Sequence, residues 1–168
     1  MAPVAVVVGP PGAGKTTVGQ AVADLLGVPF ADTDALIEAT AGKPIPEIFF
    51  DDGEAAFRAM EVDAIASSLE SFDGVLAVGG GAILHPGTRA ALAAQTVVFL
   101  SVELTDAVKR VGLGAGRPLL AVNPRATLKY LMDQRRPLYA SVATHTIATD
   151  ARTPEEIAAE VAALLKPA

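Results

Sequence analysis

The stretch that decides the fold is Gly9-Pro10-Pro11-Gly12-Ala13-Gly14-Lys15-Thr16-Thr17, which follows the apolar run Val4-Ala5-Val6-Val7-Val8. It matches the pattern Gly-x-x-x-x-Gly-Lys-[Ser/Thr] at every fixed position, between a predicted strand and a predicted helix. Glycines let the backbone curve closely around a phosphate, so that successive N–H groups point inward. A glycine-rich turn without a ligand would not explain Lys and Thr at these offsets. The stretch therefore predicts a loop that binds the phosphates of a nucleoside triphosphate.

The residues at the end of this loop carry the chemistry of a phosphate site. Lys15 supplies a positive charge for the β and γ phosphates, and the N-terminus of the following helix attracts them. The Thr16 hydroxyl is placed to ligate Mg²⁺, which we expect as the cofactor. The residues expected to bind the nucleotide here are Gly12, Ala13, Gly14, Lys15, Thr16 and Thr17.

Composition argues against several other classes of protein. The 168 residues carry a net charge of −6 and no long basic run, which argues against nucleic acid as the main partner. No apolar run approaches the roughly 18 residues needed to cross a bilayer, and the N-terminus lacks the pattern of a signal peptide. The absence of cysteine fits a reducing compartment. We expect a single-domain monomer in the cytoplasm that does not bind membranes.

Hydrophobic periodicity predicts strands that alternate with helices along the chain. Near-continuous apolar runs are typical of parallel strands covered on both faces. The expected strands are residues 4–8, 28–31, 75–78, 96–100 and 144–148, and the expected helices are residues 15–26, 35–41, 54–71, 86–94, 105–111, 125–143 and 154–165, with a short one beginning near Pro46. The buried face of the first helix is expected to hold Val18, Val22, Leu25 and Leu26. Pro137 is expected to kink or interrupt its helix. The alternation predicts an α/β domain with one parallel sheet.

Carboxylates and glycines follow two of these strands, at the edge where open α/β sheets bind ligands. Asp32 and Asp34 follow the second strand, and they alternate along an extended chain, so they need not face the same ligand. Gly79-Gly80-Gly81 follows the third strand. One or two glycines suffice for most turns, so the third favours contact between backbone and substrate over a plain turn.

Three further features have two interpretations each. Arg58 and Glu61 are neighbours on one helix and could be a solvated surface pair worth at most ~1 kcal/mol. Phe49 and Phe57 could be core residues or could line a site. The alternating glycines of residues 112–116, followed by Arg117, look like a mobile flap with a positive tip, or else like a linker.

Taken together, these motifs resemble those of shikimate kinase in type and order, and the match covers nearly the whole chain. The matching motifs are Gly9 to Thr16, Asp32-Thr33-Asp34, Ile48-Phe49 with Gly53-Glu54, Phe57-Arg58 with Glu61, Gly79-Gly80-Gly81-Ala82, Arg117-Pro118-Leu119-Leu120, and Arg135 with Pro137-Leu138-Tyr139. The resemblance implies a three-layer fold like that of nucleoside monophosphate kinases, with a five-stranded parallel sheet in the order 2-3-1-4-5. It also implies a substrate-binding segment at about residues 33–61 and a mobile lid at about 112–123.

The resemblance further implies an activity and a role for each matching residue. The activity is ATP-dependent phosphorylation of the 3-hydroxyl of shikimate, with Lys15, Asp34 and Arg117 as catalytic residues. Asp34 would contact the ring hydroxyls and either accept a proton or only orient the hydroxyl. The remaining roles are carboxylate binding by Arg58 and Arg135, ring contact by the backbone of Gly79, Gly80 and Gly81, contact with phosphate and substrate by Arg117, adenine contact by Arg110, and support of Mg²⁺ by Asp32 beside Thr16.

Other functions remain alternatives at this point. A kinase of another small hydroxy acid, such as gluconate, is hard to exclude from composition. A nucleoside monophosphate kinase would need more arginines for a second phosphate. A non-catalytic nucleotide-binding protein of the same fold would have no need of Asp34 and Arg117. The choice of Arg135 over the adjacent Arg136 depends only on its spacing from Pro137-Leu138-Tyr139.

Overall fold

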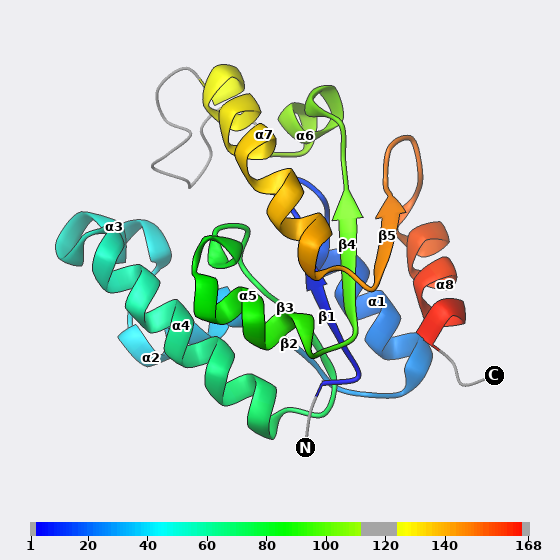
Figure 1. The fold of residues 1–168 in the computed structure, drawn as a ribbon, viewed down its shortest axis with the longest axis horizontal. Helices are drawn as coiled ribbons and strands as arrows, with labels where there is room; N and C mark the ends of the chain where they lie inside the picture. Colours follow the sequence, from blue (N-terminus) through cyan, green and yellow to red (C-terminus); the bar gives the residue numbers. More distant parts are fainter. Residues whose placement is uncertain (1–2, 112–123, 166–168) are drawn as a thin grey trace.

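The computed structural model describes residues 3–111 and 124–165, which are organised around a parallel β-sheet (Figure 1). Its strands are β1 Ala5–Val8, β2 Phe30–Asp32, β3 Val75–Ala77, β4 Val97–Ser101 and β5 His145–Ala148, in the spatial order β2-β3-β1-β4-β5. β1 is central: Val6 pairs with Leu76 of β3 and with Val97 of β4. The predicted parallel sheet and its strand order are confirmed.

Helices cover both faces of this sheet (Figure 1). The described helices are α1 Lys15–Leu26, α2 Thr33–Ala41, α3 Ile45–Asp52, α4 Glu54–Ser71, α5 Pro86–Ala93, α6 Leu104–Val111, α7 Pro124–Val142 and α8 Pro154–Leu165, with a 3₁₀ turn η1 Ala82–Leu84. Alternate residues of β1 enter different cores: Val7 packs with residues of α1 and α8, and Val6 and Val8 pack with residues of α4, α5 and α7. The three-layer arrangement is therefore confirmed.

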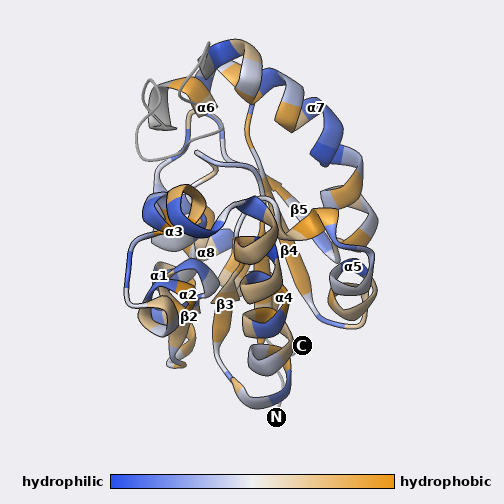
Figure 2. Ribbon diagram, turned by 90° about the vertical axis from the view of Figure 1, so that its left-hand side faces the viewer, coloured by the Kyte–Doolittle hydropathy of each residue, from blue (hydrophilic) through white to orange (hydrophobic). Residues whose placement is uncertain are grey.

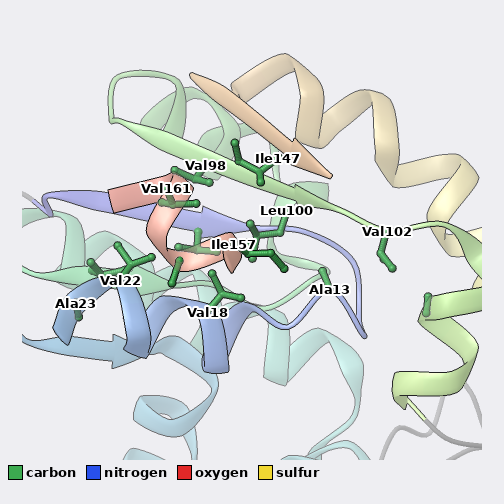
Figure 3. Close-up of a cluster of buried hydrophobic side chains, with 14 of the residues drawn as sticks. Ala13, Val18, Val22, Ala23, Val98, Leu100, Val102, Ile147, Ile157 and Val161 are labelled. Atoms are coloured by element: carbon green, nitrogen blue, oxygen red, sulfur yellow. The ribbon is translucent and has the colours of Figure 1, made fainter. Parts of the chain in front are cut away.

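The face beneath α1 and α8 is a continuous apolar core, drawn in Figure 3. Val22 of α1 and Val98 of β4 are fully buried, and Val161 of α8 is nearly so. Fully burying one such side chain stabilises a fold by about 1.5–3 kcal/mol. The strands themselves are mostly hydrophobic in Figure 2. The sheet is thus a firm support for the loops at its C-terminal edge.

The helices α2, α3 and α4 enclose a smaller core of their own. Ile37, Ile48 and Phe57, one from each helix, are buried together and separate from the two clusters on the sheet. Figure 1 places α2 and α3 on the opposite side of the molecule from α8. These helices contain the segment, residues 33–61, that the sequence indicates for substrate binding.

The expected burial of Leu25 is wrong, and the interruption expected at Pro137 does not occur. Leu25 is 56% exposed, because the buried stripe of α1 follows the i, i+4 spacing of Val18, Val22 and the partly buried Leu26, and turns away from Leu25. The helix α7 continues through Pro137 without interruption. The ring of Pro137 is exposed, and burial of Tyr139 two residues later holds the helix against its support. In the described part of the chain, no helix combines the length and apolar character of a membrane-spanning segment.

Candidate active site

The loop between β1 and α1 curves tightly beside an open cavity. Gly9, Gly12 and Gly14 have positive φ angles of 154°, 86° and 85°. A Cβ on Gly9 would lie 2.6 Å from the backbone oxygen of Leu100, so only glycine allows this approach to β4. Residues 11–18 line the cavity, whose volume is about 570 Å³. The N-terminus of α1 therefore opens onto a space large enough for a nucleotide's phosphates.

Lys15 lies back over the loop that precedes it. Its Nζ donates hydrogen bonds to the carbonyl oxygens of Gly9, at 2.9 Å, and Pro10, at 3.1 Å. The side chain also lines the cavity, so the ammonium group is held beside it. A fixed positive charge next to inward-pointing backbone N–H groups is a site for a polyanion.

Asp32, the last residue of β2, joins the phosphate loop to α2. One of its oxygens, Oδ2, accepts a hydrogen bond of 2.7 Å from the Thr16 hydroxyl, and Oδ1 accepts one of 2.8 Å from the backbone N–H of Asp34. Asp32 is thereby the N-cap of α2. One carboxylate thus fixes both the hydroxyl expected at Mg²⁺ and the start of the helix that carries Asp34.

The donors around Thr16 fit a magnesium ion. A hydroxyl oxygen and a carboxylate oxygen lie together at the cavity, and Mg²⁺ in kinase sites is held by one or two such oxygens plus the substrate's phosphates. Among the described residues there is no cluster of three or more His, Cys, Asp or Glu suited to a metal. Such a cluster is not needed where phosphates supply the remaining ligands.

The sequence indicated that Asp34 lies on an extended chain, and this is wrong. In the structure α2 begins at Thr33, and Asp34 lies in its first turn. Asp32 and Asp34 both line the cavity of the phosphate loop. A Cβ on Gly79 would lie 2.8 Å from Oδ1 of Asp34 and 2.9 Å from Oε2 of Glu61. Asp34 is therefore the point where the phosphate loop, the glycine run and α4 meet.

Arg58 and Glu61 of α4 are not a surface pair, because Glu61 is only 2% exposed. Nη1 of Arg58 donates a hydrogen bond of 2.8 Å to Oε1 of Glu61, and Nε lies 3.5 Å from Oε2 of Glu54. Burial raises the pKa of Glu61, and the charge of Arg58 opposes that rise. Glu61 thus holds one edge of the Arg58 guanidinium at the cost of its own desolvation.

The two phenylalanines beside Arg58 belong to the small core of α2, α3 and α4. Their ring centroids are 4.9 Å apart, Phe57 is 4% exposed and Phe49 is half-buried. The Arg58 guanidinium carbon lies 5.2 Å from the centroid of the Phe57 ring, within cation–π range. The interpretation as core is confirmed for Phe57, which also supports the arginine.

Arg135 of α7, a helix on the same face of the sheet as α4, completes this group of charges. It is 5% exposed, and burial lowers the pKa of its guanidinium while Tyr139 raises it; Arg58 and Glu61 are close enough to affect it too. Arg136 instead has an exposed side chain that donates a hydrogen bond of 3.3 Å to the backbone oxygen of Val102. The structure thus turns Arg135, and not its neighbour, toward Arg58 and Glu61.

The three glycines after β3 leave room for neighbouring groups, and none of them has a positive φ angle. A Cβ on Gly81 would overlap the guanidinium of Arg58, and one on Gly80 would lie 3.2 Å from Pro11 and 3.5 Å from the hydroxyl of Tyr139. A plain turn would not bring backbone so close to charged groups from two helices and to the phosphate loop.

A family model described as shikimate kinase matches residues 11–166. The chain belongs to the shikimate kinase family. A shikimate kinase from Salinispora arenicola is 73% identical over 165 residues, covering 98% of this chain and 99% of that protein.

Solved structures give the same assignment. A structure of shikimate kinase from Acinetobacter baumannii in complex with shikimate has a TM-score of 0.93 at 38% identity, covering 98% of this chain and 93% of that one. A gluconokinase from Sinorhizobium meliloti has a TM-score of only 0.56 at 24% identity, covering 96% and 90% of the two chains, which reflects the shared fold alone. The resemblance that the sequence motifs indicated is confirmed.

The structure adds one arginine that the motifs of the shikimate kinase family did not reveal in this sequence. Arg152, just before α8, lines the same cavity as the phosphate loop, together with Pro154 and Ile157. It is fixed by Glu160, at 2.7 Å, and by the backbone oxygen of Ala148, at 3.0 Å. A lone arginine ahead of a helix cap carries no signal of its own; only the packing of α8 against α1 brings it to the cavity.

Two residues expected at the nucleotide cannot be placed. Arg117 and the whole segment 112–123 lie outside the described residues. Arg110 belongs to α6, but its side chain is also outside the described part of the structure. The expected roles of both arginines stay predictions.

Proposed function

We propose that this chain transfers the γ-phosphoryl group of ATP to the 3-hydroxyl of shikimate. The observation that carries the proposal is the position of Asp34. Its carboxylate lines the cavity of the phosphate loop and, next to Gly79, lies near Glu61, which in turn interacts with Arg58 and Arg135. A phosphate site and a carboxylate site thus adjoin, with a proton acceptor between them.

At the nucleotide end, the phosphates of ATP bind the backbone N–H groups of residues 12–17, and Lys15 contacts the β and γ phosphates. Thr16 would hold Mg²⁺ directly and Asp32 from beside it, and the bound ion would neutralise charge on the transferred phosphoryl group. Arg152 and Pro154 line the same cavity, which supports a place for them along the nucleotide beyond the phosphates. Arg110 contacts the adenine.

At the acceptor end, Arg58 and Arg135 bind the carboxylate of shikimate. Nε of Arg135 is buried and has no hydrogen-bond partner among the described residues, which is typical of a donor reserved for a ligand. Planar guanidinium groups suit a carboxylate because they can donate two parallel hydrogen bonds. The ring lies on the backbone of Gly79, Gly80 and Gly81, where no side chain intrudes.

The transfer step needs little chemistry from the chain beyond positioning. Asp34 orients the attacking hydroxyl toward the γ-phosphorus and accepts its proton as the bond to phosphorus forms, or after it. Lys15 stays with the phosphate charge, and Arg117 adds a second cation there. The segment 112–123 covers the site, so that water does not compete as acceptor.

All of these groups come from one chain, which supports a monomer. The absence of cysteine fits a location in the cytoplasm.

Release of ADP, measured with a panel of acceptors, tests the proposal. The purified protein with MgATP should release ADP with shikimate and not with gluconate, a nucleoside monophosphate or water. Phosphorus NMR should identify the product as a monoester on the 3-hydroxyl. Equal rates with gluconate would favour a broader hydroxy-acid kinase, and no acceptor-dependent release would favour a protein that only binds nucleotide.

A further inference from the structure

Tyr139 lies where α7 crosses the glycine run. It is 1% exposed, and its hydroxyl donates a hydrogen bond of 2.5 Å to the backbone oxygen of Gly80. Its ring packs on Phe99 of β4, with 5.2 Å between the ring centroids. The aromatic part is therefore a core residue, while the hydroxyl ends at the backbone that would carry the substrate's ring.

Arg135 precedes Tyr139 by four residues, so both side chains leave the same face of α7. Burial raises the pKa of Tyr139 to about 12, and the neighbouring charge of Arg135 opposes that rise. Since the phenolic proton is given to Gly80, the lone pairs of the oxygen remain to face the guanidinium. A carbonyl only accepts and a guanidinium only donates, and a hydroxyl that lies between them can satisfy both.

We propose that Tyr139 is a positioning residue for the substrate carboxylate, because its hydroxyl fixes the guanidinium of Arg135 and the backbone of Gly80 relative to each other. The inference rests on the proposed role of Arg135 in carboxylate binding. It goes further in assigning the orientation of that arginine to a specific oxygen atom. No proton is transferred by Tyr139, and it does not touch the reacting atoms.

A purely structural role is met by the ring on Phe99 and the hydrogen bond to Gly80, and it would not need the hydroxyl to lie beside the charge of Arg135. A phenylalanine would fill the same space against Phe99, and a buried hydroxyl is costly unless it is hydrogen-bonded. Tyr130, the other tyrosine of the chain, is 60% exposed on the same helix and provides a matched control.

The test compares Tyr139→Phe with Tyr130→Phe on two acceptors, shikimate and its uncharged methyl ester. In Tyr139→Phe we expect the KM for shikimate to rise about tenfold or more, as for loss of a hydrogen bond to a charged group. The kcat and the KM for ATP should stay within about twofold of the wild type. With the methyl ester, kcat/KM should not change, because there is no carboxylate for Arg135 to bind. Tyr130→Phe should match the wild type with both acceptors.

Arg135→Gln in the same assay separates this inference from the proposed function. If Arg135→Gln leaves the preference for shikimate over the ester intact, Arg135 does not bind the carboxylate. The role proposed for Tyr139 is then wrong as well. If Arg135→Gln abolishes that preference but Tyr139→Phe does not, only the inference about Tyr139 is wrong. An equal loss with both acceptors in Tyr139→Phe would mean that the hydroxyl supports the fold and not the carboxylate.

A second measurement covers the case in which Tyr139→Phe does not fold. In the Tyr130→Phe background Tyr139 is the only tyrosine, so 3-fluorotyrosine can be incorporated there alone. Shikimate should shift its fluorine resonance and the methyl ester should not. A resonance that responds equally to both, or to neither, would overturn the proposal.

Discussion

The two ends of the candidate cleft are built in different ways. At the nucleotide end, most contacts are local: Lys15 reaches back five and six residues to the loop that it follows, and residues 11–18 line the cavity, to which Asp32 and Arg152 come from elsewhere in the chain. At the acceptor end, the charged groups come from α4 and α7 and meet across the glycine run after β3. The nucleotide end therefore depends mainly on one stretch of sequence. The acceptor end depends on how α4 and α7 pack on the sheet.

The difference also concerns how charge is held. The phosphate loop offers backbone N–H groups and a lysine beside an open cavity, so little charge is buried there. The acceptor end buries Glu61 and Arg135 almost completely, at 2% and 5% exposure. Buried charges must balance one another, because an unpaired one costs several kcal/mol. Substitution of a charged residue at the acceptor end should therefore change both shikimate binding and the stability of the fold. Substitution of the lysine at the nucleotide end should leave stability nearly unchanged.

The largest expected effect separates the two ends by function. Lys15→Met should lower kcat by about 10³-fold, because it removes a fixed cation from the transferred phosphoryl group. Its affinity for shikimate, measured by calorimetry, should stay within about twofold, and the melting temperature should change little. A parallel loss of shikimate affinity would contradict the division of the cleft into two ends.

The next effect tests whether binding and stability are linked at the acceptor end. Arg58→Ala should weaken shikimate binding by about 10²-fold while leaving ATP binding nearly intact. It should also lower the free energy of unfolding by about 3 kcal/mol, because Glu61 keeps its buried charge without its partner at 2.8 Å.

Two variants provide controls for Arg58. The double variant with Glu61→Gln should recover most of the stability but not the binding of shikimate. Arg136→Ala removes an exposed arginine and should change neither. If Arg58→Ala lost ATP and shikimate affinity together, the role given to Arg58 would be wrong.

Two glycine substitutions test how well each end of the cleft accommodates an added Cβ. Gly9→Ala should destabilise the fold by about 2–3 kcal/mol, because its Cβ would meet backbone of β4 and its φ is 154°. Gly81→Ala should cost under about 1 kcal/mol, because its Cβ meets only the movable end of Arg58, but the KM for shikimate should rise about fivefold. Thermal unfolding and steady-state kinetics measure both. A larger loss of stability in Gly81→Ala would reverse the comparison.

The smallest effect is the pH dependence of stability at Glu61. Burial raises its pKa above the ordinary 4.5, so the folded state keeps the proton to higher pH than the unfolded state. The free energy of unfolding should therefore fall as pH rises from about 4.5 through the raised pKa. In urea titrations at several pH values, Glu61→Gln should lack this fall. A wild-type stability that rises relative to the variant over this range would mean that attraction to Arg58 and Arg135 outweighs burial.

Much of the fold could be predicted because its signals are local. The strand Ala5–Val8 is buried on both faces, as its composition indicated, although Val4 just before it is 37% exposed. The helices α1, α4 and α8 end where periodicity and caps placed their ends. The errors at Leu25 and Pro137 have a different origin. Whether a residue at a helix end is covered, and whether packing overrides a proline, depend on neighbours that are distant in the chain.

The sequence by itself determined the phosphate loop, because its curvature and its lysine follow from adjacent residues, and it determined the alternation that forces a parallel sheet. Spacing from Pro137-Leu138-Tyr139 had already selected Arg135 over Arg136. Only the tertiary structure decided that Glu61 is buried near Arg135, and that Arg152 and the hydroxyl of Tyr139 reach the site. Burial and the direction of a side chain depend on which helices pack together on each face of the sheet, and no spacing within one segment encodes that packing.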